Sequence, residues 1–176
     1  LEPAGDDGGY RHRLDAPVGL KTQLATLEIA GKKHEVRPAV FSASTAGKPV
    51  SAQVVYAGYG ITSSELGHDD YKGLDVKGKT LVMLVNDPPV TESGSDSALD
   101  ARAFGGKAMT YYGRWTYKYE IAAEKGAAGV LLIHETEPAG YPFDVVQSKV
   151  SEQFDLVTPD KNMSRVNIEA WITLDQ

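Results

Sequence analysis

The sequence GGKAMTYYGRWTYKYEIAAEKGAAGVLLIHE, residues 105–135, decides the fold. It joins an aromatic-rich helical pattern to a wholly apolar run through one glycine. Gly126 suits the left-handed position that follows a helix, and Lys125 lies beside the negative end of the helix dipole. The uncharged run at residues 127–133 is typical of a strand covered on both faces. The stretch therefore predicts a helix, a tight turn and a buried strand.

One face of the predicted helix is aromatic. Spacings of three, four and three residues place four side chains on it, namely Tyr112, Trp115, Tyr119 and Ala122. Three charged residues lie off this face, namely Arg114, Lys118 and Glu124. We expect the aromatic face to pack on a sheet, so that Trp115→Ala lowers the free energy of unfolding by about 3–5 kcal/mol.

A second apolar strand, residues 81–85, precedes the helix and stops at Asp87-Pro88-Pro89, where proline cannot supply ladder hydrogen bonds. With the strand at 127–133 it forms a β-loop-α-β unit, whose strands we expect to be parallel with a right-handed crossover. The connecting residues 91–100 are small, polar and acidic, which is typical of a mobile surface loop.

The remaining strands favour hairpin-style pairing. Residues 20–29 and 32–37 predict a hairpin around Ala30-Gly31. Residues 52–57 predict a strand that leads into the turn at 58–60, and the period-two pattern at 165–174 predicts a final strand with its Val, Ile, Ala and Leu side chains inward.

These elements predict an α+β fold, rather than a doubly wound nucleotide-binding sheet. We expect a β-rich open barrel or sandwich of mixed strands with one or two flanking helices. The length of 176 residues suits one domain, which we place at residues 20–176 after an extended N-terminal segment at residues 1–19.

The amino-acid composition narrows the classes of partner and of chemistry open to this chain. A formal charge of −6 without a basic cluster argues against nucleic acid or an anionic membrane as the main partner. No apolar run approaches the length of a membrane span. The absence of cysteine excludes disulfides and thiol chemistry.

His134-Glu135 invites comparison with a zinc-protease helix, which needs a second histidine four residues after the first. Position 138 is Pro, and the dipeptide follows a predicted strand, so we interpret it as a surface pair at a strand end. The other histidines are isolated in sequence, and we expect no metal site in this chain.

Three residues are candidates for binding, because Tyr and Arg are enriched at binding hot spots. Tyr111 lies at the edge of the aromatic face, and Arg114 and Tyr117 lie well off it. We therefore expect these three side chains to be displayed at the surface.

Four stretches carry a family resemblance, namely PAGDDGGY (3–10), AGYGITSSELGHDDY (57–71), FGGKAMTYYGRWTYKYE (104–120) and GAAGVLLIHETEPAGYP (126–142). In this order they resemble the protease-associated (PA) domain, a non-catalytic module inserted in or attached to peptidases and sorting receptors. The resemblance is closer to the subset inserted in zinc-dependent aminopeptidases of the two-zinc exopeptidase class.

The resemblance implies an accessory domain without a complete catalytic set, and thus not an enzyme by itself. It implies no cofactor here, with zinc held by a separate catalytic domain of the same parent chain, which would be the main partner beside peptide substrate. His68-Asp69-Asp70 fits the spacing of the family's first zinc ligands, but it falls inside the accessory motif and no Glu-Glu pair follows, so we interpret the match as chance. The family is secreted, periplasmic or at the cell surface. Leu1 and Gln176 would then mark cuts, with the two ends close together.

Two alternatives stay open at this point. The chain could be an independent peptide- or sugar-binding module that uses Tyr111, Arg114 and Tyr117. It could also be a free-standing hydrolase that uses His134 and Glu135, which requires these groups to converge in one cleft.

Overall fold

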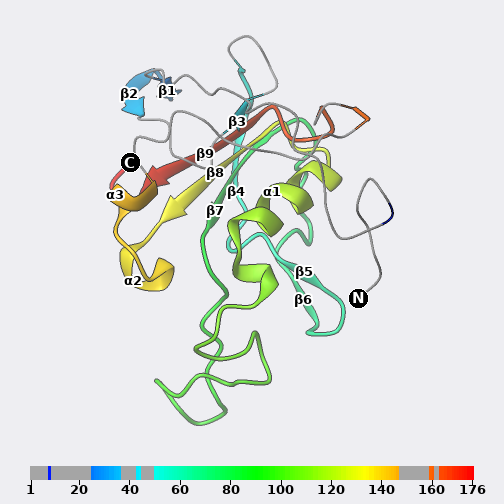
Figure 1. Cartoon of the computed structure of the whole chain (residues 1–176), viewed down its shortest axis with the longest axis vertical. Coiled ribbons are helices and arrows are strands. Elements are labelled where there is room, and N and C mark those ends of the chain that lie inside the picture. Colours follow the sequence, from blue (N-terminus) through cyan, green and yellow to red (C-terminus); the bar gives the residue numbers. More distant parts are fainter. Residues whose placement is uncertain (1–7, 9–24, 37–42, 45–49, 147–158, 161–162) are drawn as a thin grey trace.

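The structure is a computed structural model that describes residues 8, 25–36, 43–44, 50–146, 159–160 and 163–176. A five-stranded sheet forms its centre, with the strand order β3-β9-β8-β7-β4. Four strands run parallel, namely β4 (Val54–Tyr56), β7 (Thr80–Leu84), β8 (Gly129–His134) and β9 (Ile168–Thr173). The edge strand β3 (Ala43–Ser44) is antiparallel to β9 (Figure 1).

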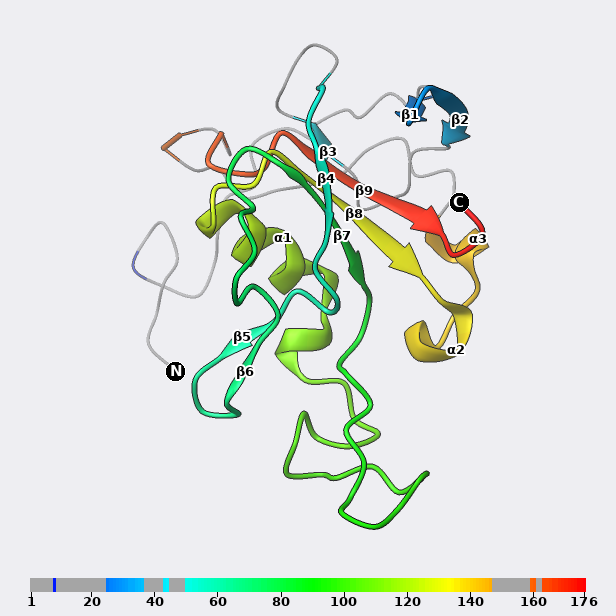
Figure 2. The ribbon, with the colours of Figure 1, turned by 180° about the vertical axis from the view of Figure 1, so that it is seen from behind.

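Two small antiparallel sheets accompany the main one. They pair β1 (Ala25–Ile29) with β2 (Lys32–Val36), and β5 (Thr62–Ser63) with β6 (His68–Asp69). The helices are η1 (Tyr111–Gly113), α1 (Trp115–Glu124), α2 (Thr136–Ala139) and α3 (Phe143–Val146). Helix α1 lies across one face of the main sheet, seen from its two sides in Figures 1 and 2.

The predicted β-loop-α-β unit is confirmed in its elements and in its parallel strands. Strands β7 and β8 pair from Thr80↔Gly129 to Leu84↔Ile133. Gly126 has φ 74° and its N–H donates to the Ala123 carbonyl, which ends α1 as the sequence indicated. Residues 91–100 form an exposed loop closed by a single β-bridge, Thr91↔Leu99.

The predicted face of the helix is confirmed only in part: Tyr119 and Ala122 are buried, whereas Tyr112 and Trp115 pack against the core only partly buried. The cause is that the helix starts later than its sequence pattern. Tyr111–Gly113 is a 3₁₀ turn, and Arg114 has an extended backbone (ψ 144°), so the α-helical phase begins only at Trp115. Trp115 is only partly buried. Five helix side chains are buried, namely Tyr117, Lys118, Tyr119, Ile121 and Ala122.

The main sheet has two apolar faces. The helix face, which packs against α1, includes Leu81, Met83, Val130, Leu132 and Trp171. The outer face, on the opposite side, includes Val82, Leu131, Ile133, Ala170 and Ile172. The inward face predicted for the last strand is therefore wrong: Trp171, expected outside, is fully buried on the helix face, and Ile172 is buried on the outer face.

The α+β class, with mixed strands and few helices, is confirmed. The described strands form one open sheet and two small ones, without a closed barrel. Of residues 1–19 the structure describes only residue 8, and Leu1 lies outside the described residues, so the expectations for the N-terminal segment and for the distance between the two ends stay predictions. None of the helices in the described ranges has the length and apolar character needed to cross a membrane.

Candidate functional site

The carboxyl ends of β4 and β7 lie next to each other, and each runs into a turn with a left-handed residue. Parallel sheets commonly bind ligands at the carboxyl ends of their strands, so this end of the sheet is the candidate site. Gly58 and Gly60 (φ 55° and 62°) follow β4, and Asn86 (φ 75°) follows β7. A Cβ at Gly60 would lie 2.0 Å from the sulfur of Met83, so this turn requires glycine.

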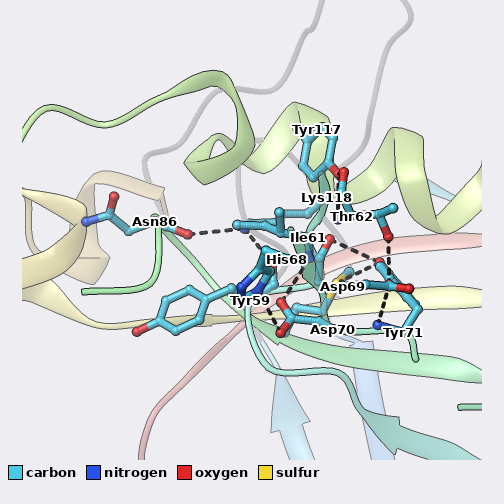
Figure 3. Close-up of polar contacts among 12 residues, drawn as sticks. Tyr59, Ile61, Thr62, His68, Asp69, Asp70, Tyr71, Asn86, Tyr117 and Lys118 are labelled. Carbon is cyan, nitrogen blue, oxygen red and sulfur yellow. Dashed lines mark hydrogen bonds and ion pairs between the residues drawn. The ribbon is translucent and has the colours of Figure 1, made fainter. Parts of the chain in front are cut away.

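Lys118 lies at the centre of the carboxyl end of the sheet (Figure 3). Its side chain is fully buried, and Nζ donates to the Tyr59 carbonyl at 2.5 Å and to the Asn86 carbonyl at 3.1 Å. Burial lowers the pKa of Lys118 to about 7, although the carboxylates of Asp87 and Asp70 oppose this shift. One ammonium group thus ties α1 to the turns after two strands.

The turn that follows β7, at Asn86 and Asp87, is held by hydrogen bonds to other segments of the chain. Asn86 Nδ2 donates to the Pro138 carbonyl at 2.8 Å, which joins the end of β7 to α2. The carboxylate of Asp87 accepts from Thr110 N at 2.6 Å and from Thr110 Oγ1 at 2.8 Å. Thr110 in turn caps η1 through Tyr112 N, so the turn after β7 positions the start of the TYYGR segment.

The β5–β6 hairpin joins the same network (Figure 3). Asp70 accepts from Ile61 N at 3.0 Å, and its other carboxylate oxygen lies 2.9 Å from His68 Nε2. Tyr117 Oη accepts from Thr62 N at 3.1 Å and lies 3.2 Å from the Thr62 carbonyl oxygen. The His68-x-Asp70 spacing therefore places these two side chains against each other.

Asp69 is exposed but serves the same hairpin. Its carboxylate accepts from Tyr71 N at 3.0 Å and from Thr62 Oγ1 at 3.1 Å. The hydrogen bond from the Tyr71 backbone is the main reason that the pKa of Asp69 lies below its ordinary value. In the part of the chain that the structure describes, no three His, Cys, Asp or Glu side chains come together as metal ligands.

The candidate binding residues divide into two groups. Tyr111 is 52 % exposed and Arg114 is exposed, as expected. Tyr117 is only 8 % exposed, so its expected display at the surface is wrong. The Tyr117 hydroxyl bonds to Thr62 of the hairpin, and its ring makes edge-to-face contacts with Tyr111 and Tyr112.

A row of edge-to-face ring contacts supports the exposed tyrosine. It runs through five residues, namely His68, Phe104, Tyr112, Tyr117 and Tyr111. The Tyr111 hydroxyl donates to the Glu120 carboxylate, and this hydrogen bond is the main cause of its raised pKa. We call the exposed pair Tyr111 and Arg114 the η1 surface.

His134 does not lie at the surface, which corrects the expectation for the His134-Glu135 pair. The imidazole is 4 % exposed, and its ring centroid lies 5.4 Å from those of Tyr141 and Phe143 and 6.1 Å from that of Trp171. Burial lowers the pKa of His134 because it disfavours the charged imidazolium. Glu135 is partly exposed.

Sequence reasoning missed Lys118, which it placed off the buried face. A signal was present in the two turns: GYG and Asn86 leave backbone carbonyls that need donors, and a long cationic side chain on the neighbouring helix can supply them. Comparison with models of protein families, and with curated proteins, finds no match to this sequence.

Proposed function

We propose that this chain is a non-catalytic accessory domain of the protease-associated type, belonging to a zinc aminopeptidase and acting through protein contact. In this proposal the catalytic domain of the parent chain holds the zinc and releases N-terminal amino acids from peptides. The accessory domain controls substrate access or stabilises the catalytic domain. A secreted, periplasmic or cell-surface location goes with this proposal.

One observation carries the proposal. The stretches that resemble the family, distant in sequence, converge on the Lys118 network: Tyr59 and Asp70 come from the second stretch, and Thr110 and Lys118 from the third. This supports a structural role for the motif, because its polar groups bond to one another. Tyr111 and Arg114, in the same motif, face outward and are the groups available to a partner.

Hydrolysis of aminoacyl reporter substrates with added zinc tests the non-catalytic role. We expect no turnover by the isolated chain. Robust turnover that a chelator abolishes would contradict the proposal and favour the free-standing hydrolase. His134→Gln is the informative variant in that case, because loss of turnover on this change would assign the activity to His134.

A peptide- or sugar-binding module is the second candidate, favoured by the exposure of Tyr111 and Arg114 on a firmly held turn. Chemical-shift titration with short peptides and oligosaccharides tests it. Shifts confined to the η1 surface, and lost in Tyr111→Ala, would support binding there. Val145→Ala is a matched control, because Val145 is similarly exposed, at 51 %, and lies on α3.

A further inference from the structure

Strand β4 forms one edge of the main sheet, and its outward side is apolar. Val54 is 47 % exposed and Tyr56 is 59 % exposed. The pairing of Tyr56 with Val82, which itself pairs with Leu131, places both exposed side chains on the outer face. The apolar row of that face thus runs from buried Leu131 to the exposed edge of the sheet.

The backbone of this edge also has unused pairing groups. Gln53 O accepts from Thr80 N, and Ala57 N donates to Val82 O, so the alternation of a parallel ladder directs the polar groups of Val55 toward β7. The N–H and C=O groups of Val54 and Tyr56 then point away from the sheet, where no other described residue bonds to them. Each is a donor and acceptor pair available to another strand.

The edge is only three residues long, and it lacks two further protections that edge strands commonly have. Natural edge strands carry charges or proline, whereas residues 49–64 contain no charged residue, and proline occurs only at the first of these positions. The whole chain has a formal charge of −6, which opposes association of its copies, and an uncharged contact surface adds no close charge repulsion to this. This edge is therefore suited to a strand without charge, and its own copy is such a strand.

We infer that two copies of this chain associate by antiparallel pairing of their β4 edges about a two-fold axis at Val55. In this register Val54 lies opposite Tyr56 of the second copy, and each such pair exchanges two backbone hydrogen bonds. The valine and tyrosine side chains then meet on the outer face, which is a favourable cross-strand pair. The two sheets become one continuous sheet, and both exposed edges are covered.

The contact is small. A stable interface buries roughly 800 Å² per partner, which three strand residues alone do not reach. The dimer is therefore reversible and its population depends on concentration. The inference does not depend on the accessory-domain function, because it shares no residue with the η1 surface.

Sedimentation velocity on the full chain over a wide concentration range tests the dimer. The average mass should rise toward that of two chains, and the amides of Val54 and Tyr56 should exchange more slowly at high concentration. In V54K/Y56K the introduced lysines face each other across the axis, so this variant should stay monomeric. In V54E/Y56K an introduced glutamate faces an introduced lysine, so the dimer should return.

The control is Val145→Lys, which adds a charge at an exposed apolar residue of α3 and should leave the dimer unchanged. Circular dichroism confirms that each variant is folded, as expected for changes at exposed side chains. A wild-type chain that stays monomeric at every concentration overturns the inference, and so does a dimer that persists in V54K/Y56K. Monomers in both double variants overturn the antiparallel register.

Discussion

The two faces of the main sheet come from the same strands, yet they are covered very differently. On the helix face, Leu81, Met83, Val130, Leu132 and Trp171 are each fully buried. On the outer face burial is deep only at the centre, and it decreases toward the β4 edge. The difference shows that apolar content alone does not tell which face of a strand receives a helix.

The two faces of the sheet also differ in their polar groups. The side covered by α1 contains a buried amino group, that of Lys118, which is hydrogen-bonded to two backbone carbonyls. The apolar cluster of the outer face contains Leu131 and Ile172 with three half-buried neighbours. We therefore expect the helix face to dominate stability and its pH dependence.

Trp171→Ala should have the largest effect. The indole is fully buried on the helix face, and removing it leaves a large cavity. We expect a loss of about 3–5 kcal/mol in the free energy of unfolding, measured by denaturant titration. Leu174→Ala is the control, because Leu174 is 62 % exposed just beyond the same strand and should change stability by less than about 0.5 kcal/mol. Equal losses in the two variants would contradict the assignment of the faces.

Leu132→Ala and Leu131→Ala compare the faces directly, since these neighbours in β8 have the same side chain. Leu132 is fully buried on the helix face, and Leu131 is 5 % exposed on the outer face. Leucine-to-alanine losses range over about 2–5 kcal/mol, and we expect Leu132→Ala near the upper end and Leu131→Ala near the lower end. A larger loss for Leu131→Ala in the same titration would reverse the order of the two faces.

The central strands could be predicted because their signals are local. The apolar runs at residues 81–85 and 127–133 and the glycine at position 126 each act within a few residues, and all three are confirmed. The face of the last strand could not be predicted from alternation. Trp171 and Ile172 are neighbours on opposite faces and both are buried, so the choice depends on where α1 lies.

The polar network could be predicted only in part, because it depends on contacts that are distant in sequence. Tyr117 bonds to Thr62, 55 positions away, and Lys118 bonds to Tyr59, 59 positions away. The helical pattern in the sequence starts at Tyr112, whereas the extended backbone of Arg114 delays the α-helix until Trp115. A helical phase counted from Tyr112 therefore predicts Tyr117 and Lys118 at the surface.

The loss of stability expected for Trp115→Ala changes with the observed helical phase. The sequence predicted a loss of about 3–5 kcal/mol, which assumes a fully buried ring. Because Trp115 is only partly buried, we now expect about 2 kcal/mol, clearly less than for Trp171→Ala. Arg114→Ala, at an exposed neighbour, serves as the control in the same denaturant titration. Equal losses for the two tryptophans would favour the original helical face.

Lys118→Met should change the pH dependence of stability. The folded-state pKa of about 7 lies below the ordinary value of 10.5, so between these values the unfolded chain holds a proton that the folded chain lacks. Stability therefore rises with pH, by roughly 1 kcal/mol per pH unit from about pH 7 to 9, before the tyrosines titrate.

Lys118→Met removes this rise, and it also lowers stability because the carbonyls of Tyr59 and Asn86 lose their donor. Denaturant titrations at several pH values measure both effects. Lys72→Met is the matched control, since Lys72 is exposed and its loss should leave the slope intact. A slope that is the same in the wild type and in Lys118→Met would mean that Lys118 stays charged when buried, held by Asp70 and Asp87, and would leave the helix face without a titrating group in this range.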